Sequence, residues 1–231
     1  MLNFVKNIIR KRFKRLYLFL TAAKKSLQGQ PVSVVFGTDR GTPIDRVYID
    51  DFLSNHAESI TGDVLEIAEN TYTLKFSRNL KQSHVLCVTA DCPAATIIGN
   101  LETGENIPEN KFDCMIITQT FAFIYDVRSV VKNCHKALKP GGILLLTNPA
   151  LSPVSTYDME RWGDFWRFTP LSMKRLLEEC FPKDQIEIKS YGNYYTVQAF
   201  MAGKAAEELN KRKMYPSAEI YPIVIAASAR K

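Results

Sequence analysis

The sequence predicts an α/β fold in which a doubly wound, seven-stranded, mostly parallel sheet follows an N-terminal basic amphipathic helix. Short apolar runs alternate along the chain with segments of helical periodicity, which is typical of parallel strands covered by helices on both faces. The 231 residues, 46% of them hydrophobic, are enough to bury one substantial core. We therefore assign residues 1–30 to the basic helix and residues 31–231 to one domain.

The basic helix is predicted from apolar residues that recur every three or four positions, as on one helix face: Leu2, Val5, Ile9, Phe13, Leu16 and Leu20. Residues 1–30 carry eight basic and no acidic side chains, which suits contact with an anionic membrane surface through residues 1–25. A helix packed on its own domain or on a partner subunit is the alternative. A signal peptide is disfavoured, because the apolar run 16–23 is short and two lysines follow it.

Outside this helix the charges are nearly balanced. The chain has a net charge of +6, but the 201 residues after residue 30 hold 22 basic and 24 acidic side chains. The domain itself is slightly acidic, so the basic balance of the whole chain does not indicate a nucleic-acid partner.

The five cysteines form no Cys-x-x-Cys pair and no cluster with histidine at metal-ligand spacing. Cys87 and Cys114 fall within apolar runs, where a free cysteine behaves as a small hydrophobic residue. We expect free thiols, no metal and a reducing, cytoplasmic compartment. The basic helix would place the protein on the inner face of the cell membrane.

The first half of the domain begins with residues 26–43, a connection that contains several glycines and prolines. A helix is predicted over residues 44–59 from the spacing of its apolar residues. Four strands are then predicted from apolar runs at Val64–Ala68, His84–Val88, Ala95–Ile98 and Phe112–Thr118.

The second half begins with a helix at Val127–Leu138, for which Asp126 is placed as the N-cap. A tight turn at residues 139–142 leads into a strand at Gly142–Thr147. After Pro149 the pattern becomes irregular and aromatic. The remaining elements are helices at Leu171–Cys180 and Thr196–Leu209 and a late hairpin-like pair of strands at Gln185–Tyr191 and Tyr221–Ala227.

The strand Phe112–Thr118 with Gln119 and Thr120, the helix after it, and the Lys-Pro-Gly-Gly turn at 139–142 together resemble the second half of a class I S-adenosylmethionine-dependent methyltransferase. The resemblance extends from about Gly41 to the C-terminus. The segments Gly41–Arg46 and Trp162–Thr169 resemble a subgroup encoded beside glycosyltransferases. The resemblance implies a Rossmann-like methyltransferase fold, S-adenosylmethionine as cofactor, a sugar or glycan intermediate as acceptor, and a glycosyltransferase partner.

The resemblance also assigns residues to the cofactor, and these positions are Arg46, Glu66, Ala68, Asn70, Thr89, Asn100, Leu101 and Gln119. Ala68 stands where most relatives have a glycine. Thr89 stands where an acid usually holds the ribose hydroxyls, with Asp91 two residues later. Arg46 either meets the methionine carboxylate or forms an ordinary surface salt bridge.

No catalytic base is evident from the pattern, because the three histidines, His56, His84 and His135, are expected to be packing or surface residues. A carboxylate can assist the deprotonation of a hydroxyl acceptor. Asp158 and Asp164, in the segment after Pro149, are therefore the candidates for catalysis.

Beside these carboxylates, Trp162, Trp166 and Arg167 are candidates for binding the acceptor. Aromatic faces pack on sugar rings, and a guanidinium holds a carboxylate or phosphate. The alternative is an aromatic plug at the end of the sheet, in which Arg167 pairs with Asp164.

The sequence thus predicts methyl transfer to an oxygen of a sugar or glycan intermediate at the cytoplasmic membrane face. A catalytically silent domain that serves as a binding or scaffold module in a glycan-assembly complex is the alternative. A nucleotide-sugar enzyme is disfavoured, since neither a GxGxxG motif nor a Tyr-x-x-x-Lys pair accompanies the first strand.

Overall fold

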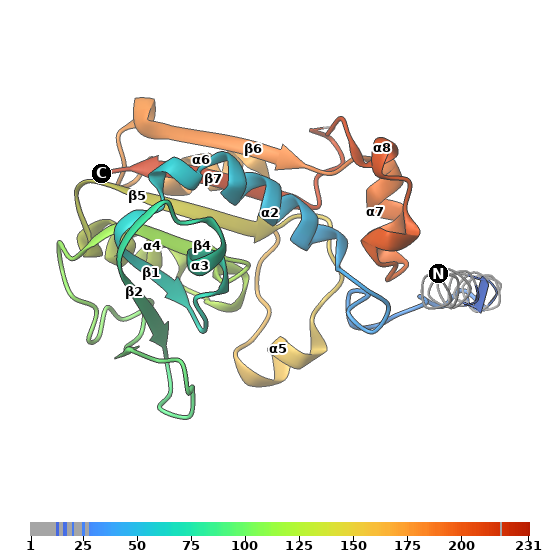
Figure 1. The fold of residues 1–231 in the computed structure, drawn as a ribbon, viewed down its shortest axis with the longest axis horizontal. Helices are drawn as coiled ribbons and strands as arrows, with labels where there is room; N and C mark the ends of the chain where they lie inside the picture. Colours follow the sequence, from blue (N-terminus) through green and yellow to red (C-terminus); the bar gives the residue numbers. More distant parts are fainter. Residues whose placement is uncertain (1–12, 14–15, 18–19, 21–24, 26–27, 218) are drawn as a thin grey trace, which may run out of the picture.

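A computed structural model describes residues 13, 16–17, 20, 25, 28–217 and 219–231. Its core is a seven-stranded sheet with the order β3-β2-β1-β4-β5-β7-β6. Neighbouring strands from β3 to β5 are parallel, whereas β7 runs antiparallel to both β5 and β6 (Figure 1). The predicted fold class is therefore confirmed, including the late antiparallel pair. The strands are β1 (Thr61–Ile67), β2 (Asn79–Cys87), β3 (Ile97–Ile98), β4 (Phe112–Thr118), β5 (Leu138–Pro149), β6 (Ile186–Tyr191) and β7 (Val224–Arg230).

The helices cover both faces of this sheet, with α2 in front and α4 and α6 behind it in Figure 1. The helices are α2 (Ile44–Asn55), α3 (Thr71–Phe76), α4 (Val127–Ala137), α5 (Thr156–Arg161), α6 (Pro170–Leu177), α7 (Tyr194–Met201) and α8 (Lys211–Met214). Short 3-10 turns lie at Ala57–Ser59, Phe121–Phe123, Lys183–Gln185 and Ala206–Glu208. The side chain of Asp126 accepts a hydrogen bond from the Ser129 amide, as expected for the N-cap of α4.

Two hydrophobic cores form because successive side chains of a strand point to opposite faces. In β4, Met115 and Ile117 pack with α4 and α6, whereas Cys114 and Ile116 pack with α2 and α7. Burial on both faces is the reason that the strands read as continuous apolar runs rather than alternating patterns.

The amino ends of the strands are joined by an ionic cluster. The Asp63 carboxylate lies within 3.5 Å of the side-chain nitrogens of Lys81, Lys111, Lys139 and His84. The hydrogen bond from Lys81, followed by those from Lys139 and His84, holds the pKa of Asp63 well below its ordinary value. The polar groups at this end of the sheet therefore neutralise one another.

Several expected boundaries differ from the structure. The helix expected at Thr196–Leu209 is wrong beyond Met201, because the chain leaves the helical conformation at Gly203, which has a positive φ. Glycine is required there, since a Cβ would overlap the carbonyl oxygen of Ser33. The short helices α3 and α5 lie where no helix was expected. The turn expected at residues 139–142 belongs to β5 as an irregularity in its pairing with β4.

The segment before α2 packs against the C-terminal half of the chain. The amide of Val32 donates to the carbonyl oxygen of Ala202 at 2.7 Å. Arg40 forms two hydrogen bonds to the Glu208 carboxylate, at 2.8 and 2.7 Å, and both side chains are largely buried. This ion pair therefore fixes the entry of the chain into the domain.

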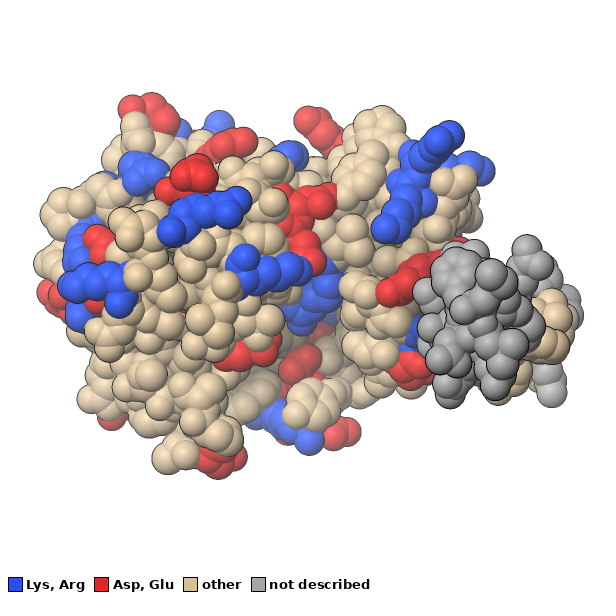
Figure 2. All heavy atoms as spheres, viewed as in Figure 1, with Lys and Arg blue, Asp and Glu red and all other residues tan. Residues whose placement is uncertain are grey.

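Most of the predicted basic helix lies outside the described residues. Of its residues that the structure describes, Phe13, Leu16, Tyr17, Leu20 and Lys25 are helical and exposed, whereas residues 28–30 are not helical. Among the helices that the structure describes, none combines the length and hydrophobicity needed to cross a bilayer. On the face drawn in Figure 2, acidic and basic side chains are interspersed over the described part of the domain.

We predict that Arg40→Ala lowers the free energy of unfolding by about 3 kcal/mol, because it leaves the buried carboxylate of Glu208 without its main partner. Arg175→Ala is the matched control, since the Arg175 side chain is 72% exposed in its pair with Glu178 and should contribute less than about 0.5 kcal/mol. Urea unfolding of the two variants measures both values. Equal effects would show that the Arg40 pair does not anchor this segment.

Candidate active site

A cavity of about 780 Å³ opens at the carboxyl ends of β1, β2, β4 and β5. Its volume is in the range of small-molecule sites, and its place is where doubly wound sheets bind their ligands. The N-terminus of α2 and the segment around α5 complete its walls. In Figure 1, α5 lies on two long arms that leave the sheet beyond the end of β5.

The cavity brings together most of the residues predicted from the sequence. Ten of the thirteen candidates line it, and they are Arg46, Ala68, Thr89, Asn100, Leu101, Gln119, Asp158, Trp162, Asp164 and Arg167. Glu66, Asn70 and Trp166 do not contribute to its lining. None of the histidines lines the cavity within the described part of the chain.

Glu66 points into the protein rather than into the cavity. Its carboxylate accepts hydrogen bonds from the amides of Tyr72 and Thr73, at 3.1 and 2.7 Å, and from the Thr73 hydroxyl at 2.8 Å. Burial raises the pKa of Glu66 even though these hydrogen bonds oppose the shift. The residue therefore anchors the first turn of α3 and thereby fixes the loop from β1 to α3.

Asn70 and Trp166 also have structural partners. Asn70 precedes α3 and donates from its side chain to the hydroxyl of Ser83 at 3.2 Å. The indole nitrogen of Trp166 lies 3.1 Å from the carbonyl oxygen of Ile124, and its ring packs against Tyr125. Trp166 thus connects the segment around α5 to the loop after β4.

Two residues without the freedom of glycine adopt left-handed backbone conformations at neighbouring strand ends. Ala68, after β1, has φ 65°, and Gln119, after β4, has φ 53°. Such a conformation costs on the order of 1–2 kcal/mol for an L-residue and occurs often at functional sites. Both residues line the cavity, and the amide of each donates to a carbonyl oxygen of a neighbouring strand end.

Asp45 and Arg46 place opposite charges at the start of α2, on the cavity wall. One carboxylate oxygen of Asp45 is buried without a hydrogen-bond partner, and burial raises the pKa of this residue although Arg46 opposes the shift. Arg46 donates to the hydroxyl of Tyr72 at 3.1 Å. Burial lowers the pKa of Arg46, but Asp45 and Tyr72 raise it more, so the guanidinium stays charged.

The two candidate catalytic carboxylates have different surroundings. The Asp164 side chain is 1% exposed, and it accepts two hydrogen bonds from Arg167, at 2.5 and 2.9 Å, and one from the Ser155 amide at 2.8 Å. Burial alone would raise the pKa of Asp164, but these hydrogen bonds lower it. Asp158 instead accepts a 2.6 Å hydrogen bond from the Ser155 hydroxyl.

Arg167 also donates to the carbonyl oxygens of Ser152 and Pro153, at 3.2 and 2.6 Å. With Asp164, it ties both arms of the segment around α5 together. The plug alternative considered from the sequence thus describes this pair correctly, while Asp158 and Trp162 still line the open cavity. Tyr125 and Phe165 meet edge to face at its rim.

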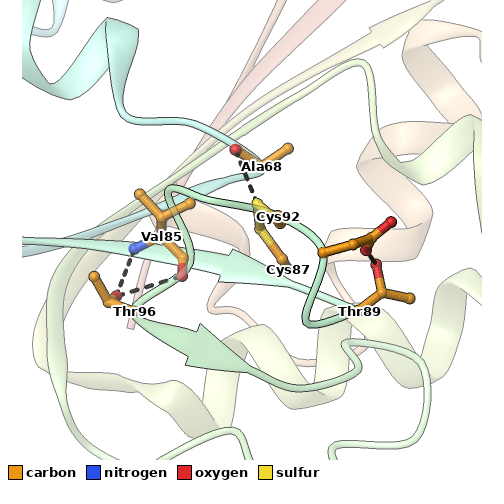
Figure 3. The surroundings of a disulfide bond; sticks show 7 residues. Ala68, Val85, Cys87, Thr89, Cys92 and Thr96 are labelled. Carbon is orange, nitrogen blue, oxygen red and sulfur yellow. Dashed lines mark hydrogen bonds between the residues drawn. A yellow bond between two sulfur atoms is a disulfide. The ribbon is translucent and has the colours of Figure 1, made fainter.

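The expectation of five free thiols is wrong. Cys87, at the end of β2, forms a disulfide with Cys92 (Figure 3). The chain reverses direction within the intervening residues and brings the two Cα atoms to 6.4 Å, within the range of a disulfide. Cys114, Cys134 and Cys180 are free.

Sequence reasoning missed the apolar lining of the cavity, namely Phe36, Ile67, Leu86, Phe123, Ile124, Phe200 and Ile223. These residues come from segments far apart in the chain, and each has an ordinary place in a local pattern. Only the packing of the segment before α2, of α7 and of the loop after β4 brings them to one cavity.

The strand order, the reversed β7 and a cavity at the carboxyl ends of the parallel strands define the fold of class I S-adenosylmethionine-dependent methyltransferases. Residues 51–146 match the model of the family described as "Methyltransferase domain". A search of curated protein sequences finds no match to this chain.

Three solved structures of similar fold are named as methyltransferases. The N-methyltransferase NodS from Bradyrhizobium japonicum, in complex with S-adenosylhomocysteine, is 16% identical with a TM-score of 0.54 over 89% of this chain and 96% of that chain. A methyltransferase from Archaeoglobus fulgidus is 13% identical with a TM-score of 0.52, over 80% of this chain and 94% of that chain. Phosphoethanolamine N-methyltransferase 2 from Haemonchus contortus is 14% identical with a TM-score of 0.54, over 87% of this chain and 53% of that chain. These similarities establish the fold.

We predict that Asp164→Asn lowers the free energy of unfolding at neutral pH by about 2 kcal/mol, because it leaves the partly buried Arg167 without its counter-charge. The folded-state pKa of Asp164 is lowered, so its stabilisation is complete above the unfolded pKa of about 3.9 and is lost as the pH falls through the folded value. The difference between parent and variant should therefore shrink below about pH 4.

Asp158→Asn is the matched control in the same segment and should change stability by less than about 1 kcal/mol, since it loses only a hydrogen bond to Ser155. Urea unfolding at several pH values measures both variants. A larger loss for Asp158→Asn than for Asp164→Asn would contradict the assigned roles.

Proposed function

We propose that this chain binds S-adenosylmethionine in the cavity and transfers its methyl group to an oxygen of a sugar or glycan intermediate at the cytoplasmic face of a membrane. The single observation that carries the cofactor proposal is the charge of the cavity. Acidic side chains outnumber basic ones by five to two in its lining, and S-adenosylmethionine carries a net positive charge. The acids are Asp45, Glu69, Glu102, Asp158 and Asp164.

Asp45 and Arg46 fit the amino-acid end of the cofactor. A bound ammonium group would supply the partner that the buried oxygen of Asp45 lacks, and the guanidinium of Arg46 suits the carboxylate. The left-handed conformations of Ala68 and Gln119 bring backbone groups to the same surface. The fit is one of charge and hydrogen-bonding capacity.

The nucleoside end fits the opposite part of the cavity. Thr89 lies beyond β2 and its hydroxyl donates to Asp91, so its oxygen remains to accept a hydrogen bond from a ribose hydroxyl. Leu86 and Leu101 supply apolar walls for a purine ring. Asn100 lines the wall beside them, although its side-chain oxygen already accepts from the amide of Glu102 at 2.7 Å.

The acceptor would enter beside α5. Trp162 is half exposed at the cavity, where its ring can pack on a sugar face. When bound, the cofactor supplies an electrophilic methyl group; the chain must hold the acceptor hydroxyl in line with it and remove the proton. We assign that proton to the Asp158 carboxylate, because Asp164 is already paired with Arg167.

The proposal of a sugar acceptor is based on this aromatic rim and on the segments that resemble the subgroup encoded beside glycosyltransferases. The membrane location rests on the basic helix, whose described residues Phe13, Leu16 and Leu20 expose apolar side chains. A glycosyltransferase partner belongs to the same proposal. A silent scaffold is the second candidate, favoured by Ala68 and by Thr89 at positions where relatives carry glycine and an acid.

Calorimetric titration with S-adenosylhomocysteine tests the cofactor proposal. We expect binding, and we expect Arg46→Ala to weaken it by about 10- to 100-fold, which corresponds to the loss of charge-assisted hydrogen bonds worth about 1.5–3 kcal/mol. Binding should also weaken at low pH, because Asp45 with its raised pKa then loses the charge that attracts an ammonium group. Asp45→Asn should remove that part of the pH dependence.

Arg78→Ala is the control for this titration, because Arg78 is exposed, pairs with Glu58 and lies outside the cavity lining. Ala68→Gly with Thr89→Asp should tighten binding, since the loss of the Cβ lets the backbone approach the cofactor more closely and the acid adds a charged hydrogen bond. Absence of binding by both the parent and this double variant would reject the cofactor and leave the scaffold candidate.

Sedimentation with anionic lipid vesicles tests the membrane proposal. The full chain should bind at low salt and lose binding as salt rises, because exposed charges are screened beyond a Debye length of about 8 Å at physiological ionic strength. A chain that begins at Pro31 should remain folded, because the Arg40 pair is retained, and should no longer bind. Unfolding of this shorter chain, or its undiminished binding, would contradict the proposal.

A further inference from the structure

We propose that Cys87 and Cys92 form a reversible thiol–disulfide site that controls cofactor affinity, with the disulfide as the high-affinity state. The inference rests on the proposed function, because it concerns the same cavity. Both cysteines line that cavity, together with Val88 and Thr89 between them. The remaining free cysteines do not contribute to its lining.

The disulfide is the main restraint on the turn after β2. Within the described structure, the hydrogen bonds of residues 88–91 are confined to that between Thr89 and Asp91. The flanking backbone is held by β-type hydrogen bonds, from Thr96 to Val85 and from Gly99 to Cys87, each at 2.9 Å. The disulfide therefore joins a well-held strand end to a turn that has little else to hold it (Figure 3).

The disulfide also brings the turn after β2 close to the loop after β1. The Cys92 sulfur lies 3.5 Å from the carbonyl oxygen of Ala68, the left-handed residue on the cavity wall (Figure 3). In the disulfide this sulfur carries no hydrogen, so the approach is a contact; the reduced thiol can donate a weak hydrogen bond to that oxygen. Reduction thus removes the covalent link to Cys87 and leaves Cys92 only this weak hydrogen bond to Ala68.

The site is accessible to a reductant from one side. Cys92 is half-buried and residues 88–91 are exposed, whereas Cys87 is buried. A dithiol attacks the Cys92 sulfur as a thiolate, the disulfide bond breaks, and Cys87 leaves as a thiolate that takes up a proton. The second thiol of the reductant then displaces Cys92, so the dithiol is oxidised to its disulfide and two protein thiols are formed.

The consequence for binding follows from the position of Thr89. With the disulfide closed, Thr89 is held at the cavity wall before the cofactor arrives. After reduction, binding must first order the turn, and the loss of conformational freedom opposes it. We expect the dissociation constant for S-adenosylhomocysteine to rise about tenfold on reduction, equivalent to about 1.4 kcal/mol.

The experiment compares the full-length protein after treatment with a low-molecular-weight disulfide and after treatment with dithiothreitol. Alkylation in denaturant followed by mass spectrometry should find three thiols in the first sample and five in the second. Titration with S-adenosylhomocysteine should show the tenfold difference. Cys92→Ser should bind weakly in both conditions, and Cys180→Ser, outside the cavity, should keep the full response.

Five thiols in both samples, or equal affinities in the presence of the disulfide, would overturn the inference. If S-adenosylhomocysteine binds in neither state, the proposed function fails, and amide hydrogen exchange of residues 88–95 then decides the redox inference. Faster exchange after reduction upholds a restraint at this turn. Unchanged exchange rejects it.

Discussion

Burial of the central sheet on both faces is the constraint on which the rest of this structure depends. Side chains of β4 enter one core or the other, so charged groups are largely displaced to the strand ends. At the amino ends they neutralise one another around Asp63 and Lys139. At the carboxyl ends they surround a cavity with an excess of acids. The amino ends of the strands are thereby stabilised, and the carboxyl ends are left for a ligand.

Glu66 is a carboxylate that this constraint leaves inside the protein, and its partners explain why it is tolerated. Amides at the start of α3 satisfy both of its oxygens, so the charge is buried with its hydrogen bonds made. Its effect on the cavity is indirect. By fixing the start of α3, it limits where the loop from β1 can run, and that loop contains Ala68 in its left-handed conformation on the cavity wall.

In the segment around α5, some polar groups stabilise the fold and others lie accessible at the cavity. Asp164 and Arg167 are paired with each other and with backbone groups of both arms. The carboxylate of Asp164 is therefore poorly placed to accept a proton from a ligand. Asp158 and Trp162 lie on the same segment but remain available at the cavity. The ion pair restrains the segment that carries Asp158 and Trp162, because Arg167 also donates to the carbonyl oxygens of Ser152 and Pro153.

The sequence by itself determined the order of the strands along the chain and the fold class, because burial on both faces and the cap at Asp126 leave signals in neighbouring residues. It also named ten polar, charged and aromatic or small residues of the cavity, but not its apolar lining. The tertiary structure alone decided where several elements end and which side chains contact one another. The chain leaves the helical conformation after α7, where Gly203 lies against the backbone of Ser33. The helices α3 and α5 are too short to show a period, and the turn after β2 pairs Cys87 with Cys92. Likewise, only packing shows that Glu66 faces α3, and packing decides between the two roles that the sequence left open for Asp164 by pairing it with Arg167. Local spacing encodes which face of an element is buried, whereas the contacts of a side chain depend on segments that meet it only after folding.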